Sequence, residues 1–221
     1  MTSAGLTREL IALRVARELR DGMVVNLGIG IPTLVANFLP PDVSIVLHAE
    51  NGILGYGGIT ANETDFDQDQ INAGGQPVTL NPGAAFFDSA TSFAMVRGGH
   101  LDVTVLGGLQ VSAKGDLANW ALPGRPGGAI GGAMDLAAGA RRVIVAMEHT
   151  TRDGDPRILE ECTYPLTARA CVSLIVTNLA VIEVNQDGLV LKEIPPGVTI
   201  EDVRAATAAK LVTDSVIVMA L

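Results

Sequence analysis

The stretch VSIVLHAENGILGYG, residues 43–57, runs from an apolar segment through a carboxylate into a glycine-rich turn. The segment Val43 to Leu47 predicts a buried strand, and Glu50 follows at its carboxyl end, just ahead of Asn51 and Gly52. Ligands of open α/β proteins bind at the carboxyl ends of the strands. A carboxylate in this position is expected to face a cleft, so Glu50 is the first candidate functional residue.

Helices and strands alternate on both sides of this stretch. Helices are predicted over residues 7–20, from residue 34, within 84–96, and over 133–140 and 199–210, and strands over 23–27, 101–106 and 143–147. A hairpin is predicted from residues 180–184 and 189–192, a turn at 81–83 and a long surface loop over 55–75. This order favours an α/β fold, an open and mainly parallel sheet with helices on both faces. No linker divides the chain, so residues 1–221 are expected to form a single domain.

The composition excludes several classes of function. The chain has 15 Lys and Arg against 24 Asp and Glu, a net charge of −9, which argues against a nucleic-acid-binding surface. Any anionic ligand would have to be held by local basic residues, backbone N–H groups or a partner chain. The 3 histidines lack metal-ligand spacing and the 2 cysteines form no zinc motif, so no metal site is expected. Because the sequence has no signal peptide or membrane span, we expect a soluble, cytoplasmic protein.

Glu50 has two interpretations other than catalysis. In a dinucleotide-binding motif, Gly28-x-Gly30-x-x-Thr33 would hold the pyrophosphate, and Glu50, about twenty residues further on, would bind a ribose hydroxyl. The match is weak, because Thr33 replaces the third glycine and Pro32 stands where the helix should begin. In a purely structural interpretation, which spacing alone slightly favours, the strand-end glutamate only caps a turn.

The catalytic interpretation makes the same carboxylate a nucleophile. A carboxylate that loses its hydration shell in a dry cleft can attack a thioester carbonyl. The attack creates an oxyanion, which glycine-rich turns stabilise through unobstructed backbone N–H groups. Two turns could supply these donors: Asn51-Gly52, next to the carboxylate, and Gly131-Gly132, further along the chain.

Longer blocks of sequence point to a family. They are VNLGIGIPT (25–33), ENGILG (50–55), INAG (71–74), SFAM (92–95) with RGGH (97–100), GDLANW (115–120), GGAMDL (131–136) and MEHT (147–150). With these blocks the chain resembles, from about Thr7 to Arg204, the B (beta) subunit of family I CoA-transferases. The resemblance is to the 3-oxoacid (succinyl-CoA:acetoacetate) and 3-oxoadipate CoA-transferase group, and it moves the nucleophile interpretation of Glu50 ahead of the other two.

The resemblance implies a CoA-transferase-type fold, an A (alpha) subunit as partner in an A2B2 heterotetramer, and an active site between the two chains. Glu50 corresponds to the catalytic glutamate, and the glycine pair at 131–132 corresponds to the oxyanion glycines. Glu50 would carry CoA as a glutamyl-CoA thioester during ping-pong exchange between an acyl-CoA, such as succinyl-CoA, and a short 3-oxo acid. CoA is then a substrate, and no permanently bound cofactor is implied. Gly28, Gly30 and Arg125 are the candidate CoA-binding residues.

Three positions depart from the family pattern. Ala49 stands where members commonly have serine, and Gly75 and Gly128 stand where they commonly have lysines near the CoA. The loss of these cations leaves Arg125 as the basic residue ahead of the glycine pair. Two alternatives therefore stay open: a related acyl-CoA hydrolase or ring-cleaving lyase subunit, and a catalytically silent partner subunit. The apolar tail over residues 216–219 is expected to form an edge strand or a subunit contact.

Overall fold

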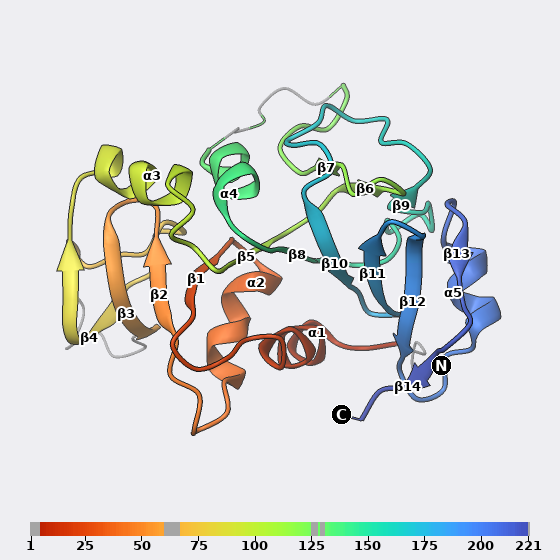
Figure 1. Ribbon diagram of the computed structural model, residues 1–221, viewed down its shortest axis with the longest axis horizontal. Helices are drawn as coiled ribbons and strands as arrows, with labels where there is room; N and C mark the ends of the chain where they lie inside the picture. The colour runs from red at the N-terminus through yellow and green to blue at the C-terminus, as the bar shows by residue number, and fades with distance from the viewer. Residues whose placement is uncertain (1–4, 60–66, 125–127, 129–130, 221) are drawn as a thin grey trace.

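The computed structural model describes residues 5–59, 67–124, 128 and 131–220. In this part of the chain the main sheet has eleven strands, and its central strands run parallel in the order β10-β8-β5-β1-β2. These are β1 (Val24–Leu27), β2 (Val46–Ala49), β5 (Val103–Leu106), β8 (Val143–Ala146) and β10 (Val172–Val176). Because they are parallel, their carboxyl ends meet at one edge of the sheet (Figure 1).

Antiparallel strands extend the sheet on both sides. Beyond β2 lie β3 (Ile53–Ile59) and β4 (Val78–Phe86), and beyond β10 lie β11 (Val181–Asn185) and β12 (Gly188–Ile194). Two short strands, β13 (Leu211–Val212) and β14 (Ile217–Val218), pair with β12 in parallel, so the apolar tail does form an edge strand. A separate small sheet consists of β7 (Leu117–Ala118), β6 (Gln110–Ser112) and β9 (Ile158–Leu159). The predicted open, mainly parallel sheet is confirmed.

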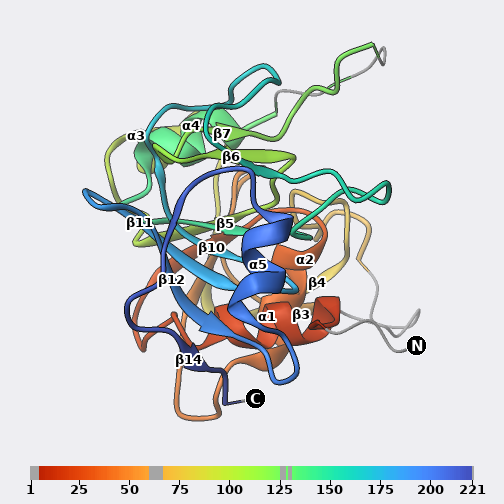
Figure 2. The ribbon, with the colours of Figure 1, turned by 90° about the vertical axis from the view of Figure 1, so that its right-hand side faces the viewer.

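Helices cover both faces of the sheet. One face carries α1 (Arg8–Ala16), α2 (Ile31–Leu34) and the 3₁₀ helix η1 (Val35–Phe38), and the other carries α3 (Ser89–Arg97) and α4 (Ala133–Gly139) (Figures 1 and 2). The last helix, α5 (Ile200–Ala206), begins at the capping box of Thr199 and Asp202. In the described residues, no helix combines the length and apolar character needed to cross a membrane.

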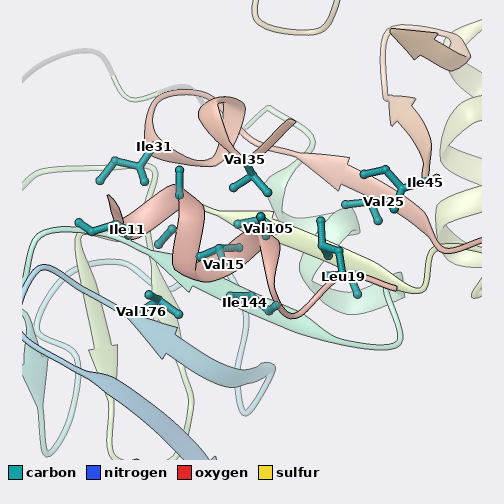
Figure 3. Close-up of a cluster of buried hydrophobic side chains, with 14 of the residues drawn as sticks. Ile11, Val15, Leu19, Val25, Ile31, Val35, Ile45, Val105, Ile144 and Val176 are labelled. Carbon is teal, nitrogen blue, oxygen red and sulfur yellow. The ribbon is translucent and has the colours of Figure 1, made fainter. Parts of the chain in front are cut away.

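The strand β8 shows why two helical layers are needed. Ile144 lies in one core cluster with Ile11 of α1 (Figure 3), whereas Val143 and Val145 lie in a second cluster with Val96 of α3. Successive side chains of a strand point to opposite faces, so a strand that is apolar throughout must be covered on both sides. All residues of β8 are buried accordingly.

Several predicted elements differ in the structure. β2 begins at Val46 rather than Val43, although Glu50 still follows its last residue. The predicted loop from residue 55 is partly wrong, because β3 continues to Ile59, and the predicted turn at 81–83 lies inside β4. Pro82 is tolerated there because β4 is an edge strand, which does not need every N–H. The last helix ends at residue 206 instead of 210.

Candidate active site

A cavity of about 410 Å³ opens at the edge where the parallel strands end. Gly28 lines it after β1, Glu50 after β2 and Gly107 after β5, and Gly131 and Gly132 line it just before α4. The structure therefore brings together four of the predicted site residues, two glycine loops and the carboxylate, from distant parts of the sequence. In the part of the chain that is described, no group of His, Cys, Asp and Glu could hold a metal ion.

The pairing of β1 with β2 positions the Glu50 carboxylate. Asn26 of β1 is the register partner of His48 of β2, and Glu50 follows two residues after His48, on the same face of the sheet. The Asn26 side chain is 1% exposed and donates from Nδ2 to Glu50 Oε2 at 2.9 Å and to the His48 carbonyl oxygen at 3.1 Å. Thr104 Oγ1 in turn donates to Asn26 Oδ1 at 3.5 Å. One carboxylate oxygen is thus fixed by a neutral donor on a central strand.

A hydrogen-bonded chain continues from Asn26 into the core. His48 Nδ1 lies 3.3 Å from Asn26 Nδ2, and His48 Nε2 lies 2.9 Å from Ser92 Oγ of α3. The two hydrogens of the Asn26 amide face three acceptors, Glu50 Oε2, the His48 carbonyl oxygen and His48 Nδ1, and the contact to Nδ1 is the longest of the three. Burial lowers the pKa of His48, and the negative charge of Glu50 opposes this shift. The neutral imidazole of His48 therefore lies between Asn26 and Ser92 and holds the Asn26 side chain in place.

The remaining polar surroundings of the carboxylate are neutral. Tyr56 of β3 and Asn72 line the same cavity. Burial raises the pKa of the Tyr56 phenol, and the charge of Glu50 raises it further, so the phenol stays protonated. Among the described residues that line this cavity, Glu50 is the only carboxylate, and none is a lysine or arginine. The described lining of the site thus holds one anion and no cation.

The glycine turn at 131–132 approaches this anion closely. A Cβ atom at Gly132 would lie 3.3 Å from Glu50 Cγ and 2.9 Å from Phe93 Cζ, so a side chain here would displace Phe93 or the carboxylate. No described residue accepts a hydrogen bond from the Gly132 N–H. The backbone at this turn can therefore face a group that reacts with Glu50.

The other predicted donor turn has a different arrangement. Gly52 donates its N–H to the Ala49 carbonyl oxygen at 2.9 Å, and Asn51 Nδ2 donates to the Ile71 carbonyl oxygen at 2.7 Å. Neither residue lines the cavity. Gly52 has φ of +126°, and a Cβ atom there would lie 2.0 Å from the Phe87 carbonyl oxygen, so glycine is needed to close the turn. These residues shape the loop that carries Glu50.

The predicted CoA-binding residues are spread more widely. Gly30 lines a neighbouring cavity rather than the one that contains Glu50, and Arg125 lies outside the described residues. Gly75 has φ of +75° in an exposed turn, and a Cβ atom at Gly128 would lie 2.3 Å from the Trp120 carbonyl oxygen. A lysine at Gly75 would be strained by the positive φ, and one at Gly128 would require a different local backbone.

The dinucleotide interpretation lacks its helix. The segment after Gly30 forms an α-helix of only 4 residues, Ile31–Leu34, followed by a 3₁₀ turn. A pyrophosphate site of that kind needs a longer helix with several free N–H groups at its start. Glu50 instead accepts a hydrogen bond from the side-chain amide of Asn26 on the neighbouring strand.

Sequence reasoning missed Asn26, the residue that holds the carboxylate. The signal was an amide inside the apolar run Val24–Leu27, since a buried polar side chain is costly unless it has a partner. The partner itself follows only from the register of β1 and β2, which the sequence does not reveal. Tyr56 and Asn72 were missed because they belong to the segment that was predicted to be a loop.

Comparison with known proteins gives consistent results. A family model described as coenzyme A transferase matches residues 8–206. The beta chain of the acetate CoA-transferase of Escherichia coli K12 is 53% identical over 203 residues, which cover 92% of each chain. The B chain of the 3-oxoadipate CoA-transferase of Pseudomonas putida is 52% identical over 209 residues, which cover 94% of this chain and 97% of the relative.

A solved structure shares the fold. The acyl-CoA transferase of Escherichia coli O157:H7 superimposes with a TM-score of 0.78 at 24% identity, over 97% of this chain and 43% of the longer one. This chain therefore spans less than half the length of that enzyme. Together with the family match and the two relatives of similar length, these findings place the protein in a known family. The chain belongs to the coenzyme A transferase family, among sequences that are beta, or B, subunits.

Proposed function

We propose that this chain is the B subunit of a CoA-transferase that moves CoA between an acyl-CoA donor, such as succinyl-CoA, and a short 3-oxo acid. One observation carries the proposal: the Glu50 carboxylate lies in the cavity at the strand ends, 2.9 Å from Asn26 Nδ2 and against Gly132. The relative that is named for 3-oxoadipate supports the class of acceptor.

Glu50 acts as the nucleophile in a ping-pong reaction. Its free carboxylate oxygen attacks the thioester carbonyl carbon, the C–S bond breaks, and an acyl-glutamyl anhydride and the CoA thiolate form. The thiolate then attacks the glutamyl carbonyl carbon and displaces the first acid, which leaves a glutamyl-CoA thioester. The acceptor carboxylate attacks that thioester, and the released thiolate attacks the acceptor's acyl carbon to give the new acyl-CoA and free Glu50. CoA is a substrate throughout, and no bound cofactor takes part.

The surroundings of Glu50 suit each of these steps. Asn26 holds Oε2 and leaves the other oxygen available for attack. The oxyanion of each tetrahedral intermediate is stabilised by backbone N–H groups of the turn at Gly131 and Gly132, and one such donor contributes about 10²–10³ in rate. The absence of a cation among the described lining residues keeps the carboxylate reactive, because no ion pair must be broken before attack.

The proposed enzyme works with a second chain. The relatives are named as beta or B subunits, which supports an A (alpha) subunit as partner. An A2B2 heterotetramer stays a prediction. A single domain over residues 1–221 is supported by the main sheet, to which both β1 and β14 belong. A cytoplasmic location stays a prediction.

Replacement of the nucleophile tests the proposal. Glu50→Gln in the two-subunit complex should abolish CoA exchange, and the wild-type chain should gain the mass of a CoA adduct after reaction with an acyl-CoA, as measured by mass spectrometry. Glu160→Gln, at an exposed glutamate outside the cavity, is the matched control and should keep full activity. Full exchange by Glu50→Gln would reject the assignment, and a wild-type chain without an adduct would favour a catalytically silent subunit.

The glycines at positions 75 and 128 favour a second candidate function. With no lysine at Gly75 or Gly128, water could compete for the intermediate, and the subunit would act as an acyl-CoA hydrolase or ring-cleaving lyase. This alternative predicts steady release of CoA thiol without any acceptor acid. A thiol assay of the complex with and without acceptor distinguishes the two functions, since a transferase gives no steady release without the acceptor.

A further inference from the structure

A second cavity of about 580 Å³ lies beside the catalytic one. Ile29, Gly107 and Gly108 line both cavities, so the loops that follow β1 and β5 form their shared wall. A Cβ atom at Gly107 would meet no atom nearer than the Ile29 carbonyl oxygen at 3.9 Å, so the wall is open at Gly107, whereas Met147 and Val145 pack closely against Gly108. A substrate whose reacting carbonyl lies beside Glu50 can therefore extend past this wall.

The second cavity differs from the first in charge. Arg8, Arg152 and Arg157 line it, and Glu148 is the only carboxylate among its described lining residues, which gives a local excess of positive charge in a chain of net charge −9. We call it the arginine cavity. The catalytic cavity, by contrast, contains the Glu50 anion and no described cation, so it would repel a second negative group of a substrate.

Two of these guanidinium groups lie against the loops of the shared wall. Arg157 Nη1 donates to the Gly108 carbonyl oxygen at 3.3 Å. A Cβ atom at Gly30, in the loop after β1, would lie 3.5 Å from an Arg8 guanidinium nitrogen. Arg8 comes from the start of α1 and Arg157 directly precedes β9, so elements far apart in the sequence bring positive charge to the same place.

The arginines have no anionic partner in the described part of the chain. No carboxylate there forms an ion pair with Arg8, Arg152 or Arg157, whereas Arg14, Arg97, Arg141 and Arg142 do form such pairs. Arginine presents a planar fork of donors that matches the oxygens of a carboxylate or phosphate. Three such groups around one cavity suit a ligand that brings its own negative charge.

We propose that the arginine cavity is an anion subsite, which binds the remote oxyanion group of a substrate while its reacting carbonyl lies at Glu50. This inference rests on the proposed transferase function. The remote group is a carboxylate or a phosphate: the second carboxylate of a dicarboxylic acid, or a phosphate of CoA itself. The subsite explains how a chain of net charge −9 accepts doubly charged substrates.

Ligand binding to a complex that cannot turn over tests the inference. The two-subunit complex with Glu50→Gln is titrated calorimetrically with two matched pairs of probes, succinate against butyrate and CoA against pantetheine. The titrations are then repeated with a complex that carries Arg8→Gln and Arg152→Gln as well. Both residues are exposed, so their replacement leaves the core intact. Arg20→Gln with Arg169→Gln is the control, because it removes the same charge from exposed positions outside both cavities.

We expect the cavity variant to weaken the binding of one probe that carries the additional anionic group by about tenfold or more, while the binding of its counterpart without that group changes by less than about twofold. Loss confined to succinate identifies the remote carboxylate as the ligand, and loss confined to CoA identifies a phosphate. Equal losses in the control, unchanged binding of both succinate and CoA, or failure of the variant to assemble with its partner would each overturn the subsite. Failure of the transferase proposal is recognised separately, as the absence of exchange and of a CoA adduct in the complex that retains Glu50.

Discussion

Two partly buried polar clusters of this molecule surround their carboxylates with opposite kinds of partner. In the first, Arg14 of α1 is bonded to Glu18 at 2.8 Å and to Glu193 of β12 at 2.7 Å, and Arg142 is bonded to Glu18 at 2.7 Å. Burial alone would raise the pKa of Glu18, but the hydrogen bonds from the two arginines lower it. Each carboxylate of this cluster has a cation.

In the second cluster the carboxylate has only neutral neighbours. Glu50 is bonded to Asn26, which is backed by His48 and Ser92, and no described cation forms an ion pair with it. The difference agrees with the roles proposed for the two carboxylates. A paired carboxylate is fixed and unreactive and joins α1 to β12, whereas an unpaired one in a cavity stays available as a nucleophile.

The largest expected effect comes from breaking the paired cluster. Arg14→Ala leaves Glu193 without its cation in a mostly buried position, which should lower the free energy of unfolding by about 3–5 kcal/mol. Chemical denaturation of the purified chain measures this, and Arg20→Ala, at an exposed arginine, should change it by less than about 0.5 kcal/mol. A loss of similar size in both variants would contradict the structural role of the cluster.

Removal of the neutral support of Glu50 should affect activity rather than folding. Asn26→Ala frees the carboxylate to rotate, and we expect kcat for exchange to fall by about 10²–10³-fold, equivalent to about 3–4 kcal/mol. Thr104→Val, which removes only the 3.5 Å contact to Asn26, should cost less than about tenfold. An Asn26→Ala complex with wild-type kcat would show that this hydrogen bond serves only the fold.

The buried histidine His149 should make the stability of the chain depend on pH. His149 is bonded to Thr177 and Thr207 at 2.8 Å, and burial lowers its pKa to about 4 from the ordinary value of 6.5. Between pH 6.5 and about 4, His149 therefore binds a proton in the unfolded chain but not in the folded chain. Stability should be complete above pH 6.5 and fall by about 3 kcal/mol as the pH decreases to about 4.

Unfolding measured across this pH range checks the slope. His149→Gln keeps a polar side chain but cannot be protonated, so its stability should depend less on pH below about 6.5. A variant that keeps the wild-type slope would assign the pH dependence to other groups.

The smallest expected effect concerns His48. Its pKa is lowered by burial but raised by the charge of Glu50, so Glu50→Gln should lower the pKa of His48 further. Titration of the histidine ring resonances by NMR measures this shift. An unchanged or higher pKa would mean that the carboxylate is not the charge that His48 senses.

The sequence predicted the central layers of this fold better than its edges. The parallel strands are apolar runs flanked by helices with clear caps, and each signal is local. β3 and β4 were missed because Gly55, Pro82 and Gly83 are typical of turns. Gly55 lies at a register shift between β3 and β4, and the edge position of β4 makes Pro82 compatible with a strand.

The candidate site was predictable as far as it depended on residue type. Glu50 and the glycine pair at 131–132 follow from a strand-end carboxylate, a glycine-rich turn and the family resemblance. Asn26 did not follow, because its role depends on which residue of β2 it faces. The unequal use of the two turns could not be foreseen either, since the Gly52 N–H is engaged by a carbonyl oxygen of its own loop.

The attachment of Glu50 to Asn26 has a consequence for the motions of the enzyme. Asn26 lies on a central strand flanked by β2 and β5, so opening the middle of the sheet would be needed to displace the strand that supports the proposed nucleophile. Segments of low local stability open first, and central strands exchange their amide hydrogens only near global unfolding. The region around Glu50 and Asn26 should thus stay folded while the outer hairpins fray. Slow amide hydrogen exchange at β1 and β2 would show this.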